Sequence, residues 1–368
     1  MTAGAPDDPR WAALADALVG RAVEVKPGER VMIAMGEVDS APLAAAVNAA
    51  VVRAGGYPQV QFLSETLRHD LLQHGSEEQL AWTPEIEAYG MEWADVYIAL
   101  RGGRALDLHA DVAADRMARN QAAQGRISTL RWQKTRWTLV RVPSREMAED
   151  SGRDFEVMMD EFFNAALVDW EIEEPALVHL AERLNGSRSV RIEGPDTDLS
   201  FSVAGRTWVP AVGRINVPDG EVMTAPVEGT VHGVVTFEQP AVFGGRRIRD
   251  LRLRWDDGEL VEATSSTEQD FLDRIIDTDP GARHIGEFAL GTNRHLTGFA
   301  DDILLDEKIA GTWHLALGRA YPECGGTVQS AVHWDIIKDT RQGGTVSVDG
   351  VPVLRDGMLP PAGEHRGS

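Results

Sequence analysis

The spacing of apolar residues changes once along this chain, and that change limits the folds it can adopt. Between residues 30 and 143, short apolar runs alternate with helical patterns, whereas from 189 onward short strands follow one another with turns between them. Strands that alternate with helices form parallel sheets covered by helices, while short strands joined by turns form antiparallel sheets. We therefore expect an α/β region followed by a β-rich α+β region.

The first region predicts a doubly wound, flavodoxin-like α/β domain. An alanine-rich helix from Ser40 to Arg53 ends at Gly55-Gly56 and lies between two predicted strands, which makes a β-α-β unit. No G-x-G-x-x-G or G-x-x-x-x-G-K-[ST] motif follows the first strand, so the sequence does not support nucleotide binding. The predicted strands are 30–35, 57–63, 96–100 and 137–143.

The second region begins after the acidic stretch DWEIEEPA, so we predict domains at 1–175 and 176–368. Turn sequences such as Asp256-Asp257-Gly258 separate its strands, and a helix is predicted near STEQDFLDRII. This β-rich domain contains all the candidate metal ligands described below. Its predicted strands include SVRIEG, LSFSVAG, VHGVVTF, RIRDLRLRW and GELVEAT.

Composition and charge argue against several classes of function. A net charge of −22 argues against a nucleic-acid partner and against docking on anionic membranes. No apolar run approaches the ~20 residues that span a bilayer, and the N-terminus lacks a signal-peptide pattern. The single cysteine, Cys324, excludes an intramolecular disulfide and fits a reducing cytoplasm. We expect a cytoplasmic enzyme.

Four polar residues stand out in apolar surroundings. His333 and Asp335 fall in the predicted strand VHWDII, where residues two apart point to the same face and can bind one metal ion. Glu221 and Glu287 each follow a glycine in a short apolar segment. A buried carboxylate needs a partner, and a cation would serve both. The alternative is that each is an edge-strand acid facing water.

Four ordered segments make the chain resemble the thermophilic-aminopeptidase (M29) family of metallopeptidases. They are GEVMTAP, GARHIGEFALG, ILLDEKIAGTWHLALGRAYPECGG and SAVHWDIIKD. Successive motif residues are separated by 66, 27, 7 and 12 positions, and the last gap suggests a shortened loop. The resemblance is strongest from about residue 194 to 339.

The resemblance implies a metal-dependent aminopeptidase with two divalent ions, Zn, Co or Mn, roughly 3.5–4 Å apart and bridging a water. Glu287 is then the carboxylate that bridges the ions, and Glu221 also accepts the proton of the water. Tyr321 is the candidate donor to the oxyanion, although a core tyrosine bonded to backbone is the alternative. The resemblance also implies peptide substrates and a homodimer. The implied metal ligands are Glu221, Glu287, His314, His333 and Asp335.

Two other functions stay open at this point. An iron-dependent, ring-cleaving dihydroxypyridine dioxygenase on the same scaffold needs only two histidines and one carboxylate, which His314, His333 and Asp335 could supply. A non-catalytic, metal-stabilised binding protein would not need Tyr321. Because Glu221, Glu287 and Tyr321 are all present, the two-metal hydrolase is favoured. Motifs of zincins and serine hydrolases are absent from the sequence.

Overall fold

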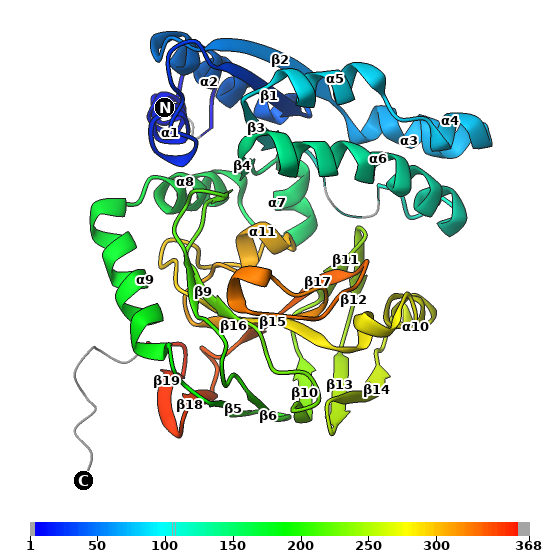
Figure 1. Cartoon of the computed structure of the whole chain (residues 1–368), viewed down its shortest axis with the longest axis vertical. Helices are drawn as coiled ribbons and strands as arrows, with labels where there is room; N and C mark the ends of the chain where they lie inside the picture. Colours follow the sequence, from blue (N-terminus) through cyan, green and yellow to red (C-terminus); the bar gives the residue numbers. More distant parts are fainter. Residues whose placement is uncertain (1–3, 105, 107, 360–368) are drawn as a thin grey trace. The chain divides into compact units, whose positions relative to one another are not determined.

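The computed structural model (Figure 1) describes residues 4–104, 106 and 108–359. The chain divides into two compact units, of which the first is Met1–Val168 with Gly213–Pro218 and the second is Asp169–Val212 with Asp219–Ser368. The predicted mixed α/β class, with one parallel sheet and antiparallel sheets, is confirmed. The boundary at residue 175 between independently folding domains stays a prediction.

Unit 1 is built on a five-stranded parallel sheet in the order β2-β1-β3-β4-β8. The first four positions follow the 2-1-3-4 order of flavodoxin-like sheets. The strands are β1 (Arg30–Gly36), β2 (Tyr57–Leu63), β3 (Val96–Arg101), β4 (Arg136–Arg141) and β8 (Asn216–Val217). The helices are α1 (Arg10–Ala17), α2 (Ala41–Arg53), α3 (Glu65–His74), α4 (Glu77–Ala81), α5 (Glu85–Trp93), α6 (Ala114–Lys134), α7 (Arg145–Ser151) and α8 (Phe155–Ala166).

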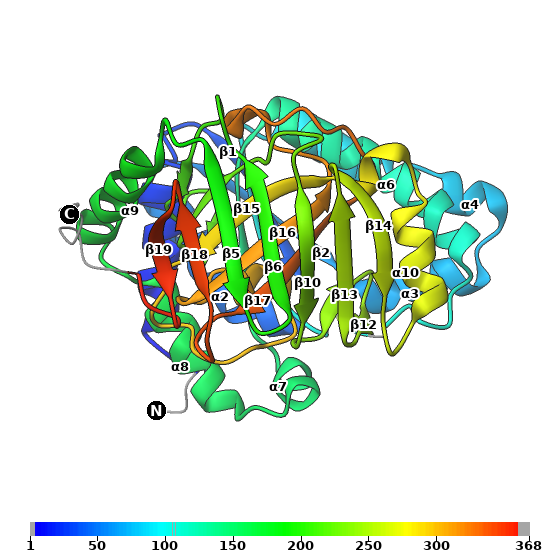
Figure 2. The ribbon, with the colours of Figure 1, turned by 90° about the horizontal axis from the view of Figure 1, so that it is seen from below.

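Unit 2 contains two larger antiparallel sheets. The seven-stranded sheet has the order β14-β13-β10-β6-β5-β18-β19, and Figure 2 shows it in front of the five-stranded sheet β17-β16-β15-β9-β7. The seven-stranded sheet comprises β5 (Ser189–Gly194), β6 (Thr197–Ser202), β10 (His232–Phe237), β13 (Leu251–Asp256), β14 (Glu259–Thr264), β18 (Thr345–Val348) and β19 (Val351–Arg355). The five-stranded sheet comprises β7 (Val209–Ala211), β9 (Glu221–Thr224), β15 (Ile285–Gly291), β16 (Thr312–Gly318) and β17 (His333–Asp339).

Shorter elements complete unit 2. A two-stranded sheet pairs β11 (Ala241–Phe243) with β12 (Arg246–Ile248), and the helices are α9 (Trp170–Leu184), α10 (Gln269–Ile276) and α11 (Ile303–Asp306). The predicted single strand RIRDLRLRW is wrong, because it divides into β12 and β13. Asp250 has a φ of 51°, and this left-handed backbone conformation ends an extended strand.

The two large sheets of unit 2 pack their apolar faces against each other. Aromatic rings from the seven-stranded sheet contact rings from the five-stranded sheet, with centroids 5.2 Å apart for Phe201 and Phe288 and 6.1 Å apart for Phe237 and Trp313. All four side chains belong to one buried cluster. One face of the five-stranded sheet is therefore buried in this core, and the side chains on its opposite face are not part of the core.

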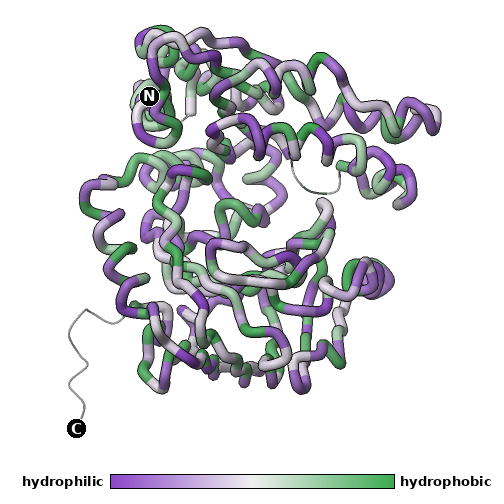
Figure 3. Tube along the Cα trace, in the orientation of Figure 1, coloured by the Kyte–Doolittle hydropathy of each residue, from purple (hydrophilic) through white to green (hydrophobic). Residues whose placement is uncertain are grey.

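Hydrophobic and hydrophilic residues are interspersed along the helices and strands (Figure 3). Within the part of the chain that the structure describes, no helix combines the length and the apolar character of a bilayer-spanning segment.

Candidate metal centre

The strand register places the five candidate ligands on one face of the five-stranded sheet. In an antiparallel pair, residues directly opposite each other share a face, as do residues two apart on one strand. Ala316 lies opposite both Glu287 and Asp335, which puts these two acids on the same face. The same reasoning adds His314, which is two residues from Ala316 on β16. His333 is two residues from Asp335 on β17, and Glu221 lies opposite Gly291 on β15.

Small residues separate the candidate ligands on this face. Ala289 lies opposite His314, and Gly291 and Gly318 lie opposite Glu221 and His333. Because these residues occupy little volume, the longer carboxylate and imidazole side chains can converge above them. The alternate residues of the same strands point into the core between the sheets; they include Phe288, Trp313, Leu315 and Leu317.

A bulge directs Glu287 toward the cluster. The register between β15 and β16 shifts between Ile285 and Glu287, at Gly286. A Cβ atom at Gly286 would lie 2.2 Å from the backbone oxygen of Gly318, so only glycine fits there. β-bulges re-aim a neighbouring side chain. The glycine before this acid is therefore required by a close approach of two backbone segments.

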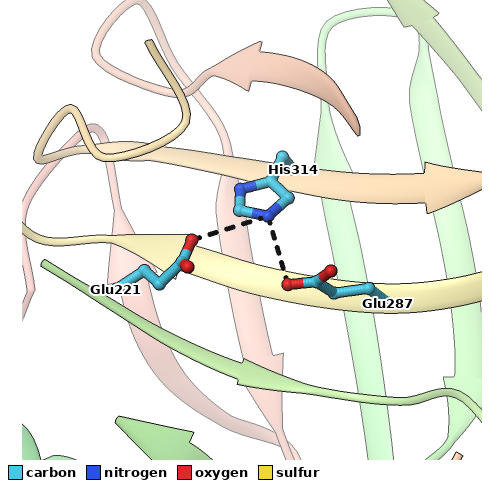
Figure 4. Close-up of side chains that lie close together, drawn as sticks. All are labelled: Glu221, Glu287 and His314. Carbon is cyan, nitrogen blue, oxygen red and sulfur yellow. Dashed lines mark ion pairs between the residues drawn. The ribbon is translucent and has the colours of Figure 1, made fainter. Parts of the chain in front are cut away.

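His314 lies between two carboxylates (Figure 4). Its Nε2 atom is 3.6 Å from Oε2 of Glu221 and 3.6 Å from Oε1 of Glu287. His314 is 1% exposed and Glu287 is 3% exposed, so the alternative of water-facing edge acids is wrong for Glu287. It is also wrong for Glu221, which is 5% exposed.

A second group of donors shares Glu287 with the first. The Nε2 atom of His333 is 3.3 Å from Oε2 of Glu287 and 3.5 Å from Oδ1 of Asp335. Glu287 therefore directs one oxygen toward His314 and the other toward His333. Two ligand atoms on one tetrahedral Zn²⁺ lie about 3.4 Å apart when each bond is about 2.05 Å. The observed separations are close to that value.

The carbonyl of Arg319 sets the orientation of His333. Nδ1 of His333 lies 2.7 Å from this oxygen, and because a carbonyl only accepts, Nδ1 carries the proton. In the neutral imidazole, which is the form that binds a metal ion, Nε2 then has a lone pair directed toward Glu287 and Asp335. Metal-binding histidines commonly donate their other N–H to such a carbonyl.

Three buried atoms of the cluster have no hydrogen-bond partner among the residues described. They are Oε2 of Glu221, Oδ1 of Asp335 and Nδ1 of His314. Leaving a buried polar group unpaired costs about 1–3 kcal/mol, and more for a charged group. These two carboxylate oxygens lie among nitrogen and oxygen donors of the same cluster. Borderline metals such as zinc bind donors of both kinds. The donor set therefore fits divalent cations.

Burial and the neighbouring charges raise the pKa values of Glu221 and both histidines and lower that of Glu287. Burial raises the pKa of Glu221 to about 7, although the charge of Lys308 opposes the shift. Burial would lower the pKa of His314, but the hydrogen bond with Glu287 and the charges of Glu221 and Glu287 raise it to about 10. The same opposition raises the pKa of His333 to about 9, with Asp335 as the main charge. Burial also opposes the shift at Glu287, where hydrogen bonds with both histidines lower the pKa.

Tyr321 lies beside the second group of donors. Its ring packs edge-on against His333 with centroids 5.0 Å apart, and the guanidinium carbon of Arg319 lies 5.4 Å from its ring centroid. Burial, together with the charges of Glu287 and Asp335, raises the pKa of the phenol above its usual value. Tyr321 therefore keeps its proton and can donate a hydrogen bond.

Cys324 does not belong to the cluster. Burial raises the pKa of its thiol to about 12, so little thiolate forms at neutral pH. Cys324 is therefore a buried, unreactive thiol.

Sequence reasoning missed three charged residues next to the candidate ligands. Glu307, Lys308 and Asp219 are all buried, and donor atoms of Glu307, His314 and Asp335 lie within 4.8 Å of one another. The available signal was the run Asp306-Glu307-Lys308, because three consecutive charges between Leu305 and Ile309 are unusual in an apolar segment.

Comparisons with known proteins agree with this geometry. The family model described as "Thermophilic metalloprotease (M29)" matches residues 7–359. Aminopeptidase T from Thermus aquaticus is 31% identical over 293 residues, which are 67% of this chain and 70% of that protein. Aminopeptidase T from Thermus thermophilus is 36% identical over 169 residues, but this stretch spans only 42% of this chain and 41% of the relative.

Two solved structures share the fold. The wild-type AmpT structure from Thermus thermophilus has a TM-score of 0.81 at 24% identity, covering 95% of this chain and 98% of that one. A 2,5-dihydroxypyridine dioxygenase from Pseudomonas putida KT2440 has a TM-score of 0.61 at 14% identity, covering 97% and 98%. At these identities both likenesses concern the fold alone.

Proposed function

This chain belongs to the thermophilic metalloprotease (M29) family, and we propose that it is a metal-dependent aminopeptidase that releases N-terminal residues from peptides. One observation carries the proposal. Glu287 divides its two carboxylate oxygens between His314 and His333, so that two groups of donors share one acid. A shared carboxylate of this kind suits a site for two cations.

We assign Glu221, Glu287, His314, His333 and Asp335 as the metal ligands, with Glu287 as the bridging acid. The unpaired oxygens of Glu221 and Asp335 support this assignment, because a cation would complete their interactions. Two bound divalent ions, Zn, Co or Mn, would lower the pKa of a shared water and neutralise negative charge that develops on the scissile carbonyl.

We assign separate proton-handling roles to two residues of this chain. Glu221 accepts the proton of the attacking water, because its Oε2 atom has no hydrogen-bond partner among the described residues and faces the cluster. Tyr321 donates a hydrogen bond to the oxyanion of the tetrahedral intermediate, since its raised pKa keeps the phenol protonated. The position of Tyr321 beside His333 supports this role.

The dioxygenase alternative is less well supported. Its three required ligands, His314, His333 and Asp335, are close together here, and the dioxygenase fold is similar. Yet Glu221 and Glu287 are buried beside the same histidines, and a site for one iron gives them no role. The named sequence relatives are aminopeptidases.

Three further features of the enzyme are also proposals. We propose that it acts in the cytoplasm, that two copies form a homodimer and that residues 1–175 and 176–368 are separate domains. The net charge of −22 would also draw the cationic amino terminus of a peptide toward the protein.

Metal analysis together with an activity assay tests the proposal. We expect about two divalent ions per chain by mass spectrometry and release of the N-terminal residue from short peptides. A blocked N-terminus on the same peptide should prevent release. One iron per chain with no peptide hydrolysis would contradict the aminopeptidase and favour the dioxygenase.

A further inference from the structure

A lysine enclosed by unit 2 contacts the candidate ligands without having a role so far. Lys308 is 1% exposed. Its Nζ atom lies 2.5 Å from Oε1 of Glu221, 2.8 Å from Oε1 of Glu307 and 3.6 Å from Oδ1 of Asp219. Lysine is almost never fully buried unless it is paired, so its presence here needs an explanation.

We propose that Lys308 is a positioning residue that holds Glu221 by one carboxylate oxygen and leaves only the other oxygen facing the metal-binding cluster. The inference rests on the proposed function, because it concerns how the same site is assembled. Nζ of Lys308 binds Oε1 of Glu221, whereas Oε2 lies 3.6 Å from Nε2 of His314. Oε2 is also one of the buried atoms without a hydrogen-bond partner in the described residues.

The backbone around Lys308 and Glu221 is held at a fixed separation by Asn293. The N–H of Asn293 donates to the carbonyl of Lys308 at 2.8 Å, and its side-chain amide donates to the carbonyl of Asp219 at 2.8 Å. The neighbouring N–H of Thr292 donates to the carbonyl of Gly220 at 2.9 Å. These bonds connect two segments that are distant in sequence, so the contact between Lys308 and Glu221 does not depend on two flexible side chains alone.

Because Glu307 forms an ion pair with Lys308, the site can contain this lysine and still attract cations. Lys308 and Glu307 are adjacent and form an ion pair, so together they add no net formal charge. An unpaired ammonium near the ligands would repel divalent cations, whereas the pair provides an oriented donor without that repulsion. Groups that orient a ligand in this way typically change metal affinity or activity by about 10–100-fold when removed.

Another buried lysine in the same unit provides a matched control. Lys338 is 3% exposed, and its Nζ donates to the carbonyls of Thr236 at 2.6 Å and Pro195 at 3.3 Å and pairs with Glu238. None of these partners belongs to the metal-binding cluster. Replacing Lys338 with Met therefore removes a buried ammonium without releasing Glu221.

The test compares Lys308→Met, Lys308→Arg and Lys338→Met as full-length proteins loaded with Co²⁺. The readouts are the visible spectrum of bound Co²⁺, the number of ions per chain, and kcat and KM for a short peptide. We expect Lys308→Met to keep about two ions but to change the spectrum, because Glu221 can then bind through both oxygens or turn away. We expect kcat to fall about tenfold or more, with KM within about threefold. Lys308→Arg should restore part of both, and Lys338→Met should keep the native spectrum.

Several results would overturn the inference. An unchanged spectrum and kcat in Lys308→Met would do so, as would an equal spectral change in Lys338→Met, which would indicate general loosening of the unit. If circular dichroism shows that Lys308→Met does not fold, the double variant Glu307→Gln/Lys308→Met is measured by the same criteria. This variant removes both charges of the ion pair, so Glu307 is not left as an unpaired buried charge.

Failure of the proposed function would look different. A wild-type protein that binds Co²⁺ but releases no N-terminal residue would refute the aminopeptidase, while the spectral comparison would still decide the role of Lys308. If wild type binds no Co²⁺, a crystal structure of Lys308→Met decides. A Glu221 that still directs Oε2 toward His314 in that structure would overturn the inference.

Discussion

Two groups of histidine and carboxylate donors in the described part of unit 2 differ in almost everything except donor type. In the first, donor atoms of Glu221, Glu287 and His314 lie within 4.8 Å of one another and are buried. In the second, donor atoms of His232, Asp256 and Asp257 satisfy the same distance, but all three residues are exposed. Spacing alone therefore does not identify a metal site.

The difference lies in what surrounds the donors. The side chains of His232 and Asp256 are 64% and 58% exposed and lie 3.2 Å apart, so water already satisfies their polar atoms. Ordering them around a cation would cost side-chain entropy for little gain. The buried donors are held by strand pairing on one sheet face and include oxygens that have no partner among the described residues. A cation therefore gains most where the protein has already removed water and fixed the ligands.

Removing metal should have the largest effect on activity, because the buried donors are the proposed metal site. Dialysis against a chelator should reduce peptide hydrolysis by about 100-fold or more, and adding Zn²⁺, Co²⁺ or Mn²⁺ should restore it. At a metal concentration of about 100 times Kd, binding stabilises the folded protein by about 2.7 kcal/mol, so the unfolding temperature should fall on chelation. Calorimetry with and without metal measures this change. Full activity after complete metal removal would refute the buried site.

Replacing the shared acid should remove most of the metal. Glu287→Gln keeps the side-chain shape but removes the charge that lies between His314 and His333. We expect roughly one ion per chain or fewer, and a loss of activity similar to that after chelation. Mass spectrometry of the purified variant measures the ion content. A variant that keeps both ions and full turnover would contradict the bridging role of Glu287.

Removing the hydroxyl of Tyr321 should lower turnover without loss of metal. Tyr321→Phe deletes one hydrogen-bond donor to the oxyanion, and deletion of one such donor typically lowers kcat by about 10²–10³. The ring and its contact with His333 can persist, so the metal content should not change. Steady-state kinetics together with metal analysis separates the two effects. A normal kcat would show that Tyr321 is a packing residue.

Much of this buried cluster could be predicted because each candidate ligand lies in a short, recognisable segment. The family match confirms the predicted resemblance, and the family and its named relatives confirm the predicted class, a metal-dependent aminopeptidase. Alternation along the strand VHWDII predicts that His333 shares a face with Asp335. The structure places these residues as expected.

The parts that sequence reasoning missed depend on contacts between distant residues. Lys308 and Glu221 are 87 positions apart, and their contact arises from the bonds that Asn293 makes to both segments. Nothing local in the run Asp306-Glu307-Lys308 indicates which carboxylate its lysine binds. The break between β12 and β13 was missed for the opposite reason, because it is local but depends on the backbone conformation of Asp250.

The exposed group provides the smallest expected effect and the most direct check on the comparison. The exposed group consists of His232, Asp256 and Asp257. His232→Ala removes its imidazole, and Asp256→Asn removes the carboxylate charge that lies 3.2 Å from that imidazole. Because exposed ion pairs contribute about 0–1 kcal/mol, the free energy of unfolding should change by less than about 1 kcal/mol. Metal content, measured by mass spectrometry, and kcat should stay at wild-type values in both variants. If either variant lost one of two bound ions, the exposed group would be a metal site, and burial would not be the property that distinguishes the two places.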